Sequence, residues 1–240
     1  MWGETADARH LSEAKTLIDY GVFDYIEVTP TADASVDLFD IGVPIIIHAT
    51  SERWGTNLGD RSKRDFTMQM TQMSFEWADI LQAKYVIMHP GHGEMNSTLE
   101  FLDMIADKRV LVENMPMVSI RGDTMLGYTI DEMKTIAGER FGFCMDVGHA
   151  IKAAMSLKKN PQWFAGTMRL VMRPLMYHLS DGSSDKIYDD HLSLGSGGFD
   201  LGFIKRLISR DQECPVTFET PRLPDSLRED VKNVITYLSI

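Results

Sequence analysis

FCMDVGH, at residues 143–149, is a short apolar run that ends in an acidic side chain, Asp146, with His149 three residues later. An apolar run of this length, followed at once by polar residues and a helical pattern, is typical of a buried parallel strand that leads into a helix. The same pattern recurs along the chain, because six of seven clear apolar runs end in histidine, aspartate or glutamate. One repeated feature therefore predicts both the fold and the candidate site.

Short apolar runs alternate with longer amphipathic stretches throughout the chain. The expected strands are residues 25–28, 44–48, 85–89, 110–113, 141–146, 175–179 and 216–219, with a very short eighth strand at residues 1–3. The expected helices are residues 8–20, 62–82, 99–106, 130–137, 150–157, 201–209 and 227–238. Strands that alternate with helices form parallel units, and eight units in about 250 residues predict an α/β fold, a (β/α)8 TIM barrel with a short or irregular first strand. A doubly wound open sheet is the alternative.

Most of the predicted strands end in a residue that can bind a metal or move a proton. These residues are His48, His89, Glu113, Asp146, His178 and Glu219, and the pair Asp189 and His191 lies in the loop after the His178 strand. The carboxyl ends of barrel strands meet on one face, where that fold places its active site, whereas an open sheet would spread them along a line. Each residue alone is more often a core or capping side chain. However, five of the seven histidines fall on this face, and burying so many ionisable groups is costly unless they hold a cation.

The types of donor indicate which metal would bind. Imidazole and carboxylate groups without thiolate suit Zn²⁺, Mn²⁺ or Fe²⁺ better than Ca²⁺ or Mg²⁺. Nine candidate ligands, His149 included, exceed what one ion needs. With three or four ligands per ion and one bridging carboxylate, they suit two or three ions.

The composition is that of an ordinary globular protein. The chain has 240 residues, 44% hydrophobic and 25% charged, and we expect a single domain over residues 1–240. No run approaches the roughly 18 apolar residues of a membrane span, and the N-terminus has no signal-peptide pattern, so we expect no membrane partner. Two widely separated cysteines, Cys144 and Cys214, indicate a reducing cytoplasm. The net charge of −11 disfavours non-specific binding of nucleic acid.

In these features the chain resembles the xylose isomerase-like TIM barrels and, within them, the endonuclease IV branch. The resemblance is carried by IH at 47–48, HPG at 89–91, VEN at 112–114, MDVGH at 145–149, YHLSD at 177–181, DDHLSLG at 189–195 and FETPR at 218–222. It implies a phosphoester hydrolase that acts at abasic sites in DNA with Zn²⁺ or Mn²⁺. It also implies three metal positions: His48, His89 and Glu113; Glu113, Asp146, His178 and Glu219; and His149, Asp189 and His191. Glu113 bridges the first two positions, and Glu219 and Glu113 are the candidate catalytic residues, with Glu219 orienting or deprotonating the nucleophile.

Other features favour a small substrate over duplex DNA. The loop before the His48 strand is short and acidic, and its residues 29–34 offer no arginine or aromatic wedge. Glu27 looks like a residue of the sugar isomerase branch, so it is either a substrate contact or a strand carboxylate paired with a nearby base. His92, in a glycine loop, and Arg222, in a loop after a strand, are further candidate substrate contacts. We therefore expect a phosphodiester or sugar phosphate as substrate, with duplex DNA less favoured.

Two other hypotheses stand beside the hydrolase. A sugar or sugar-phosphate isomerase or epimerase needs only the second metal position with one ion, and its two glutamates would move a proton on either side of a carbonyl-bearing carbon. The short loops, Glu27 and the net charge favour this alternative. A non-catalytic barrel that binds a ligand or a metal is the third hypothesis, and the intact ligand set argues against it.

Overall fold

The eight strands follow one another around a parallel sheet in the order of the sequence. The computed structural model describes residues 2–3, 8–223 and 226–240. The strands are β1 (Trp2–Gly3), β2 (Ile26–Val28), β3 (Ile45–His48), β4 (Val86–Met88), β5 (Val110–Glu113), β6 (Gly142–Asp146), β7 (Met176–Leu179) and β8 (Val216–Phe218). Each strand pairs in parallel with the next. The predicted (β/α)8 barrel and its very short first strand are confirmed, although Met1 lies outside the described residues.

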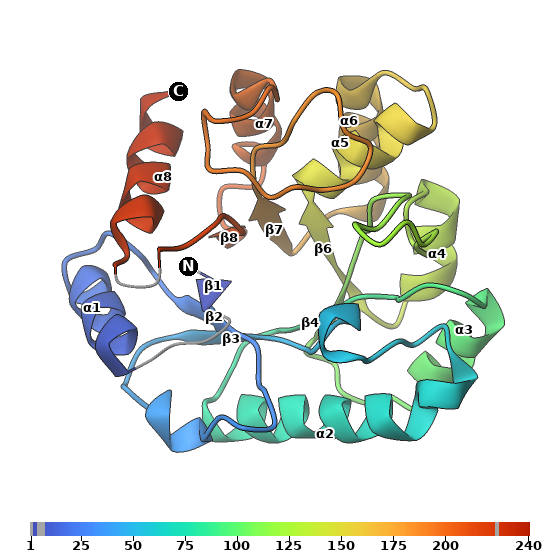
Figure 1. Cartoon of the computed structure of the whole chain (residues 1–240), viewed down its shortest axis with the longest axis horizontal. Helices are drawn as coiled ribbons and strands as arrows, with labels where there is room; N and C mark the ends of the chain where they lie inside the picture. Colours follow the sequence, from blue (N-terminus) through green and yellow to red (C-terminus); the bar gives the residue numbers. More distant parts are fainter. Residues whose placement is uncertain (1, 4–7, 224–225) are drawn as a thin grey trace.

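Helices surround the strands on the outside of the barrel (Figure 1). They are α1 (Ala8–Asp19), α2 (Arg64–Ile80), α3 (Met95–Asp103), α4 (Ile130–Ala137), α5 (Val147–Ser156), α6 (Pro161–Met172), α7 (Leu201–Ile208) and α8 (Arg228–Ser239). Short 3-10 turns are η1 (Val36–Leu38), η2 (Glu52–Trp54) and η3 (Arg61–Lys63). Helix α3 begins at Met95, four residues before its predicted start at residue 99. Within the described part of the chain, no helix has the length and apolar character needed to cross a membrane.

Helix α6 was not expected, although its start is marked in the sequence. Asn160 caps it, since the side-chain oxygen accepts the backbone N–H of Trp163 at 2.8 Å, and Pro161 occupies the first turn. Both residue types are favoured at these places. The helix carries exposed apolar residues, with Trp163 60% and Leu170 70% exposed. This blurs the amphipathic pattern on which helix prediction depends.

Side chains join the last strand to the beginning of the sheet, where β1 contributes only two residues. The hydroxyl of Thr217 in β8 donates to the carboxylate of Glu27 in β2 at 2.6 Å. The same hydroxyl lies 2.8 Å from the phenol oxygen of Tyr25. These buried polar contacts connect β8 to β2 across the barrel interior.

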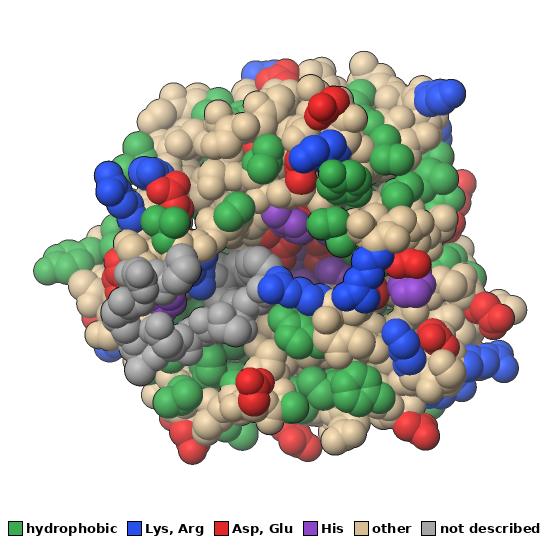
Figure 2. All heavy atoms as spheres, in the orientation of Figure 1, with side chains coloured by type: hydrophobic (Ala, Val, Ile, Leu, Met, Phe, Trp, Pro, Cys, Tyr) green, Lys and Arg blue, Asp and Glu red, His purple; other side chains and the backbone are tan. Residues whose placement is uncertain are grey.

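The carboxyl ends of the strands open on the face seen in Figure 2. This face is hollowed at its centre, and histidine and acidic side chains are visible inside the hollow. The hollow is therefore where the predicted metal ligands should be sought.

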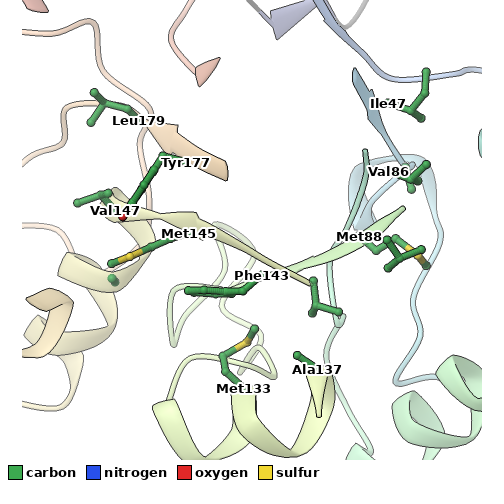
Figure 3. Close-up of a cluster of buried hydrophobic side chains, with 14 of the residues drawn as sticks. Ile47, Val86, Met88, Met133, Ala137, Phe143, Met145, Val147, Tyr177 and Leu179 are labelled. Carbon is green, nitrogen blue, oxygen red and sulfur yellow. The ribbon is translucent and has the colours of Figure 1, made fainter. Parts of the chain in front are cut away.

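Alternate residues of strands β3 to β7 pack into two separate apolar layers. The outer layer lies between the sheet and the helices, and Figure 3 shows part of it, including Ile47, Phe143 and Met145. The inner layer is a small plug inside the barrel that contains Cys144, between Phe143 and Met145, and Ile46, next to Ile47. Strand periodicity thus assigns every second residue to the barrel interior.

Candidate metal centre

The same periodicity places the candidate ligands directly on the inner plug. The plug consists of Tyr25, Ile46, Ile87, Leu111, Cys144 and Met176. Two residues after each of these comes a charged or imidazole side chain, in order Glu27, His48, His89, Glu113, Asp146 and His178. Side chains two residues apart face the same side of a strand, so these residues form the next layer of the barrel interior. Glu219 likewise lies two residues after Thr217, which is buried.

Glu113 is fully buried at the centre of this layer. Its Oε2 lies 3.5 Å from Nε2 of His48, 3.4 Å from Nε2 of His89 and 3.2 Å from Nδ1 of His178. Its Oε1 lies 3.2 Å from Nδ1 of His149. One carboxylate is therefore within reach of histidines on several sides, which is the arrangement that a bridging ligand requires.

All nine candidate ligands lie in one connected cluster. The ligand atoms of His48, His89 and Glu113 are within 4.8 Å of one another, and those of Glu113, Asp146, His178 and Glu219 form a second such group. These two groups contain the same residues as the first two positions implied by the resemblance.

The third group lies beside the first two. Oδ2 of Asp189 is 3.3 Å from Nε2 of His149 and 2.9 Å from Nδ1 of His191. His149 and His191 also form a group with Asp146, which the sequence had placed only in the second position. His191 has a φ of +42°, in the left-handed region that non-glycine residues rarely adopt, and such backbone strain is concentrated at functional sites.

Several buried polar atoms of the cluster make no hydrogen bond within the described residues. They are both carboxylate oxygens of Glu113, Oδ2 of Asp146, Oδ2 of Asp189 and Nδ1 of His178. Buried polar groups without a hydrogen bond are rare and costly. A divalent cation would satisfy them together, and the mixture of imidazole and carboxylate suits Zn²⁺ or Mn²⁺. The residues present therefore fit a metal cluster.

The charges of the cluster strongly influence one another. Burial opposes ionisation of Glu113, yet His178 and His89 hold the pKa of this carboxyl well below its usual range. Burial also disfavours a charged His89, but Glu113 and Glu52 raise its pKa to about 10. The pKa of Asp146 is raised to about 7, mainly by burial. A cation that binds here must therefore displace protons from histidine.

Backbone carbonyl groups orient two of the histidines. Nδ1 of His48 lies 2.8 Å from the carbonyl oxygen of Ala49, which leaves Nε2 for the centre. Nδ1 of His149 lies 2.9 Å from the carbonyl oxygen of Asn114. The side chain of Asn114 also joins the ends of β5 and β6, since it donates to the carbonyl of Asp146 at 2.9 Å and accepts its N–H at 3.0 Å. Asn114 belongs to the VEN motif at 112–114, which does not predict its role in positioning the ligands.

Carboxylates outside the ligand set orient two further histidines. Glu52 lies 3.4 Å from Nδ1 of His89, and Glu27 lies 3.1 Å from Nε2 of His178. Carboxylate–histidine–metal arrangements fix the ring and raise its basicity. Sequence reasoning missed Glu52, which follows no apolar run, and offered Glu27 only as a substrate contact or a paired strand carboxylate.

A fully buried lysine anchors the loop that carries Asp189 and His191. The ammonium group of Lys152 donates to the carbonyl oxygens of Ser183 at 2.7 Å and Lys186 at 3.1 Å. It also lies 3.3 Å from Oδ1 of Asp190, the residue between the two ligands. The third group of donors is thus held to helix α5 by a buried ion pair.

A cavity of about 440 Å³ opens above the cluster. His92, one of the three expected substrate contacts, lines it. Glu27 is fully buried and Arg222 pairs with Asp230 at 3.2 Å, and neither belongs to the residues that line the cavity. The structure thus gives Glu27 and Arg222 partners within the protein instead of places in the cavity.

The cavity wall carries basic side chains that the sequence had not singled out. Arg53, Lys63 and Arg121 line it, together with Trp54 and Ile120. Arg53 and Lys63 come from the neighbouring turns η2 and η3, whereas Arg121 comes from a loop after β5 that is distant in the sequence. A chain with a net charge of −11 therefore places three basic side chains, beside the acidic Glu52 and Asp123, in the wall of its cavity.

Comparison with known proteins identifies one family, curated proteins that are similar in sequence and solved structures that share the fold. A family model described as a xylose isomerase-like TIM barrel matches residues 19–237. A Metamycoplasma arthritidis protein named probable endonuclease 4 is 24% identical over 217 residues, which cover 80% of this chain and 75% of that protein. The endonuclease IV structure from Thermus thermophilus is 21% identical, with a TM-score of 0.77 over 100% of this chain and 98% of that one. The structure of a D-tagatose 3-epimerase-like protein is 20% identical, with a TM-score of 0.70 over 90% of this chain and 89% of that one.

Proposed function

The chain belongs to the xylose isomerase-like TIM barrel family, and on that premise we propose that it is a divalent-metal-dependent hydrolase of phosphoester bonds. The observation that carries the proposal is the position of Glu113, whose two oxygens face four histidines and make no hydrogen bond within the described residues. A bridging carboxylate of this kind serves a cluster of two or three ions. A mononuclear site would leave His48, His89 and His191 buried or half-buried without a function.

The proposed ligands follow the three groups of donors. The first position would use His48, His89 and Glu113, the second Glu113, Asp146, His178 and Glu219, and the third His149, Asp189 and His191. Divalent ions at these positions would supply acidified water and would neutralise the charge of a phosphate group. We propose Zn²⁺ as the ion, with Mn²⁺ as the alternative.

Glu219 is the proposed acid–base residue because it is a cluster carboxylate that also lines the cavity. Its Oε1 lies 3.2 Å from Nδ1 of His178, and its Oε2 lies 3.2 Å from Nε2 of His191. Burial opposes its ionisation, but His178 and His191 hold its pKa at about 2, so Glu219 is ionised and can bind a cation or accept a hydrogen bond from water. Glu219 would orient the attacking water and take its proton, while Glu113 holds the cluster together beneath it.

The proposed substrate is a small phosphodiester or sugar phosphate. The basic residues Arg53, Lys63 and Arg121 in the cavity wall suit a phosphate group. The acidic loop after β2, with Asp33, Asp37 and no basic residue from 29 to 40, disfavours the broad contact that duplex DNA makes. We also expect a reducing cytoplasm as the location, since Cys144 and Cys214 are free thiols.

A mononuclear isomerase or epimerase is the second candidate. Glu113 and Glu219 both lie 3.2 Å from Nδ1 of His178, so two carboxylates flank one ligand, and Glu219 also lines the cavity. Such a pair can move a proton on either side of a carbonyl-bearing carbon. This chemistry needs one ion at the second position only.

Metal content and substrate tests separate the two candidates. The protein is purified without chelator, its metals are counted by elemental analysis, and turnover is measured with bis(p-nitrophenyl) phosphate, an abasic-site oligonucleotide and a panel of ketoses with their phosphates. Two or three ions per chain with cleavage of a phosphoester support the hydrolase. One ion per chain with ketose epimerisation and no phosphoester cleavage overturns it.

A further inference from the structure

Glu52 is not among the proposed metal ligands, yet it contacts one of them. Its Oε2 lies 3.4 Å from Nδ1 of His89, and the side chain is only 20% exposed. On the other side of the same ring, Nε2 of His89 faces Glu113 at 3.4 Å. An imidazole that presents Nε2 to a metal carries its proton on Nδ1, and a carboxylate there fixes both the tautomer and the orientation of the ring.

The group that contacts His89 comes from a different part of the fold than the groups that orient the other histidines. Those supports lie inside the barrel or at the strand ends, as with Glu27, which is fully buried beside His178. Glu52 instead belongs to η2, and its neighbours Arg53 and Trp54 line the cavity. A carboxylate from the cavity wall, Glu52, therefore orients His89, a proposed ligand of the metal centre.

The base of this wall segment is fixed without η2. Thr56 donates its hydroxyl to the carbonyl oxygen of Thr50 at 2.7 Å. The side-chain oxygen of Asn57 accepts the N–H of Gly59 at 3.1 Å and that of His92 at 3.0 Å. Thr56 and Asn57 are buried, whereas residues 52–55 are partly or fully exposed. The base is therefore held by bonds that do not involve residues 52–55, and the Glu52 contact links the turn to the centre.

We propose that Glu52 is a positioning residue that couples metal binding at the first position, through His89, to the seating of the cavity wall that carries Arg53 and Trp54. The inference rests on the metal centre of the proposed function but not on the reaction it catalyses. Loss of the Glu52 carboxylate weakens the first position and releases the wall from the centre. The second and third positions keep their own ligands and supports.

The test is a metal titration of the chelator-treated full-length protein with Zn²⁺ and with Co²⁺. Affinities are measured by competition with a chromophoric chelator, and the wall is followed by the emission of Trp54, which a Trp54→Phe variant identifies. Glu52→Ala removes the carboxylate, and Glu52→Gln retains a hydrogen-bond acceptor. Glu100→Gln is the matched control, because it removes a carboxylate from surface pairs with Arg61 and Arg64.

Glu52→Ala is expected to weaken one metal equivalent about ten- to a hundredfold and to abolish the metal-dependent change in Trp54 emission. Glu52→Gln should lie between this variant and wild type, and Glu100→Gln should match wild type. The proposal is overturned by unchanged affinity in Glu52→Ala, by equal weakening in Glu100→Gln, or by a Trp54 response that is absent in wild type or survives in Glu52→Ala.

The proposed function can fail separately. A wild-type protein that binds metal and shows these effects, but cleaves no phosphoester, overturns the hydrolase and supports the role of Glu52. A wild-type protein that binds no metal overturns both.

Discussion

Replacement of Glu113 by glutamine should disable the centre with little change in shape. The variant keeps the size of the side chain but removes a negative charge that faces three histidines through Oε2 at 3.2–3.5 Å. It also turns one oxygen into an amide NH₂, which cannot bind a cation. Because Glu113 belongs to both the first and the second proposed position, one substitution affects both.

The structure allows the size of the effect to be worked out. The first position falls from three protein ligands to two, and the second falls from four to three. Loss of a residue that merely supports a ligand costs about ten- to a hundredfold in metal affinity, so loss of a ligand should cost at least about a hundredfold, or about 2.8 kcal/mol. The first position should empty before the second because it retains fewer ligands. Loss of the charge stabilisation at the reacting phosphate should lower kcat at least about a hundredfold.

Elemental analysis and phosphodiester turnover of the Glu113→Gln variant test this reasoning. We expect at least one ion fewer per chain than in wild type and almost no turnover with bis(p-nitrophenyl) phosphate. The Glu100→Gln variant should retain both properties, and the thermal midpoints of the chelated proteins show whether each variant is folded. Normal metal content with full turnover in Glu113→Gln would refute both the bridging role and the proposed metal chemistry.

Three further predictions concern the cluster and its support. Replacing His149 and His191 together by alanine should remove one ion by elemental analysis and most phosphoester turnover, whereas a mononuclear isomerase would keep its ion. The folded protein raises the pKa of His89 from 6.5 to about 10. Protonated His89 should therefore stabilise the metal-free protein fully below pH 6.5, and this stabilisation should be lost as the pH rises through 10. Metal affinity should rise over the same window, and a flat pH profile in chelator competition would contradict this. Lys152→Met should cost about 1–3 kcal/mol in urea unfolding, because the carbonyls of Ser183 and Lys186 lose their donor while Asp190 keeps Lys186 as a partner, and a loss below about 0.5 kcal/mol would count against the anchor.

The sequence predicted the barrel well because its signals are local. Apolar runs of four to six residues, most of which lead into a polar residue, mark strands wherever they occur, and the intervening helices need only a periodic face. Helix α6 was missed because exposed Trp163 and Leu170 obscure that face. The first strand was expected to be very short, and β1 has two residues. A hydrogen bond from Thr217 of β8 to Glu27 of β2 links residues 190 positions apart, which no local pattern could have paired.

The amino-acid sequence at the ends of the strands determined, by itself, which residues face the metal centre. A strand alternates its side chains with a period of two, and a parallel barrel brings all carboxyl ends to one face, so His48, His89 and Glu113 had to meet there. Tertiary structure alone decided how they meet. Closure of the barrel sets the distances between residues from different strands, and it makes Glu113 the shared neighbour of His48, His89 and His178. Loops follow no period, so only the folded chain shows that Glu52 supports His89 and that Arg222 turns to Asp230 instead of the cavity.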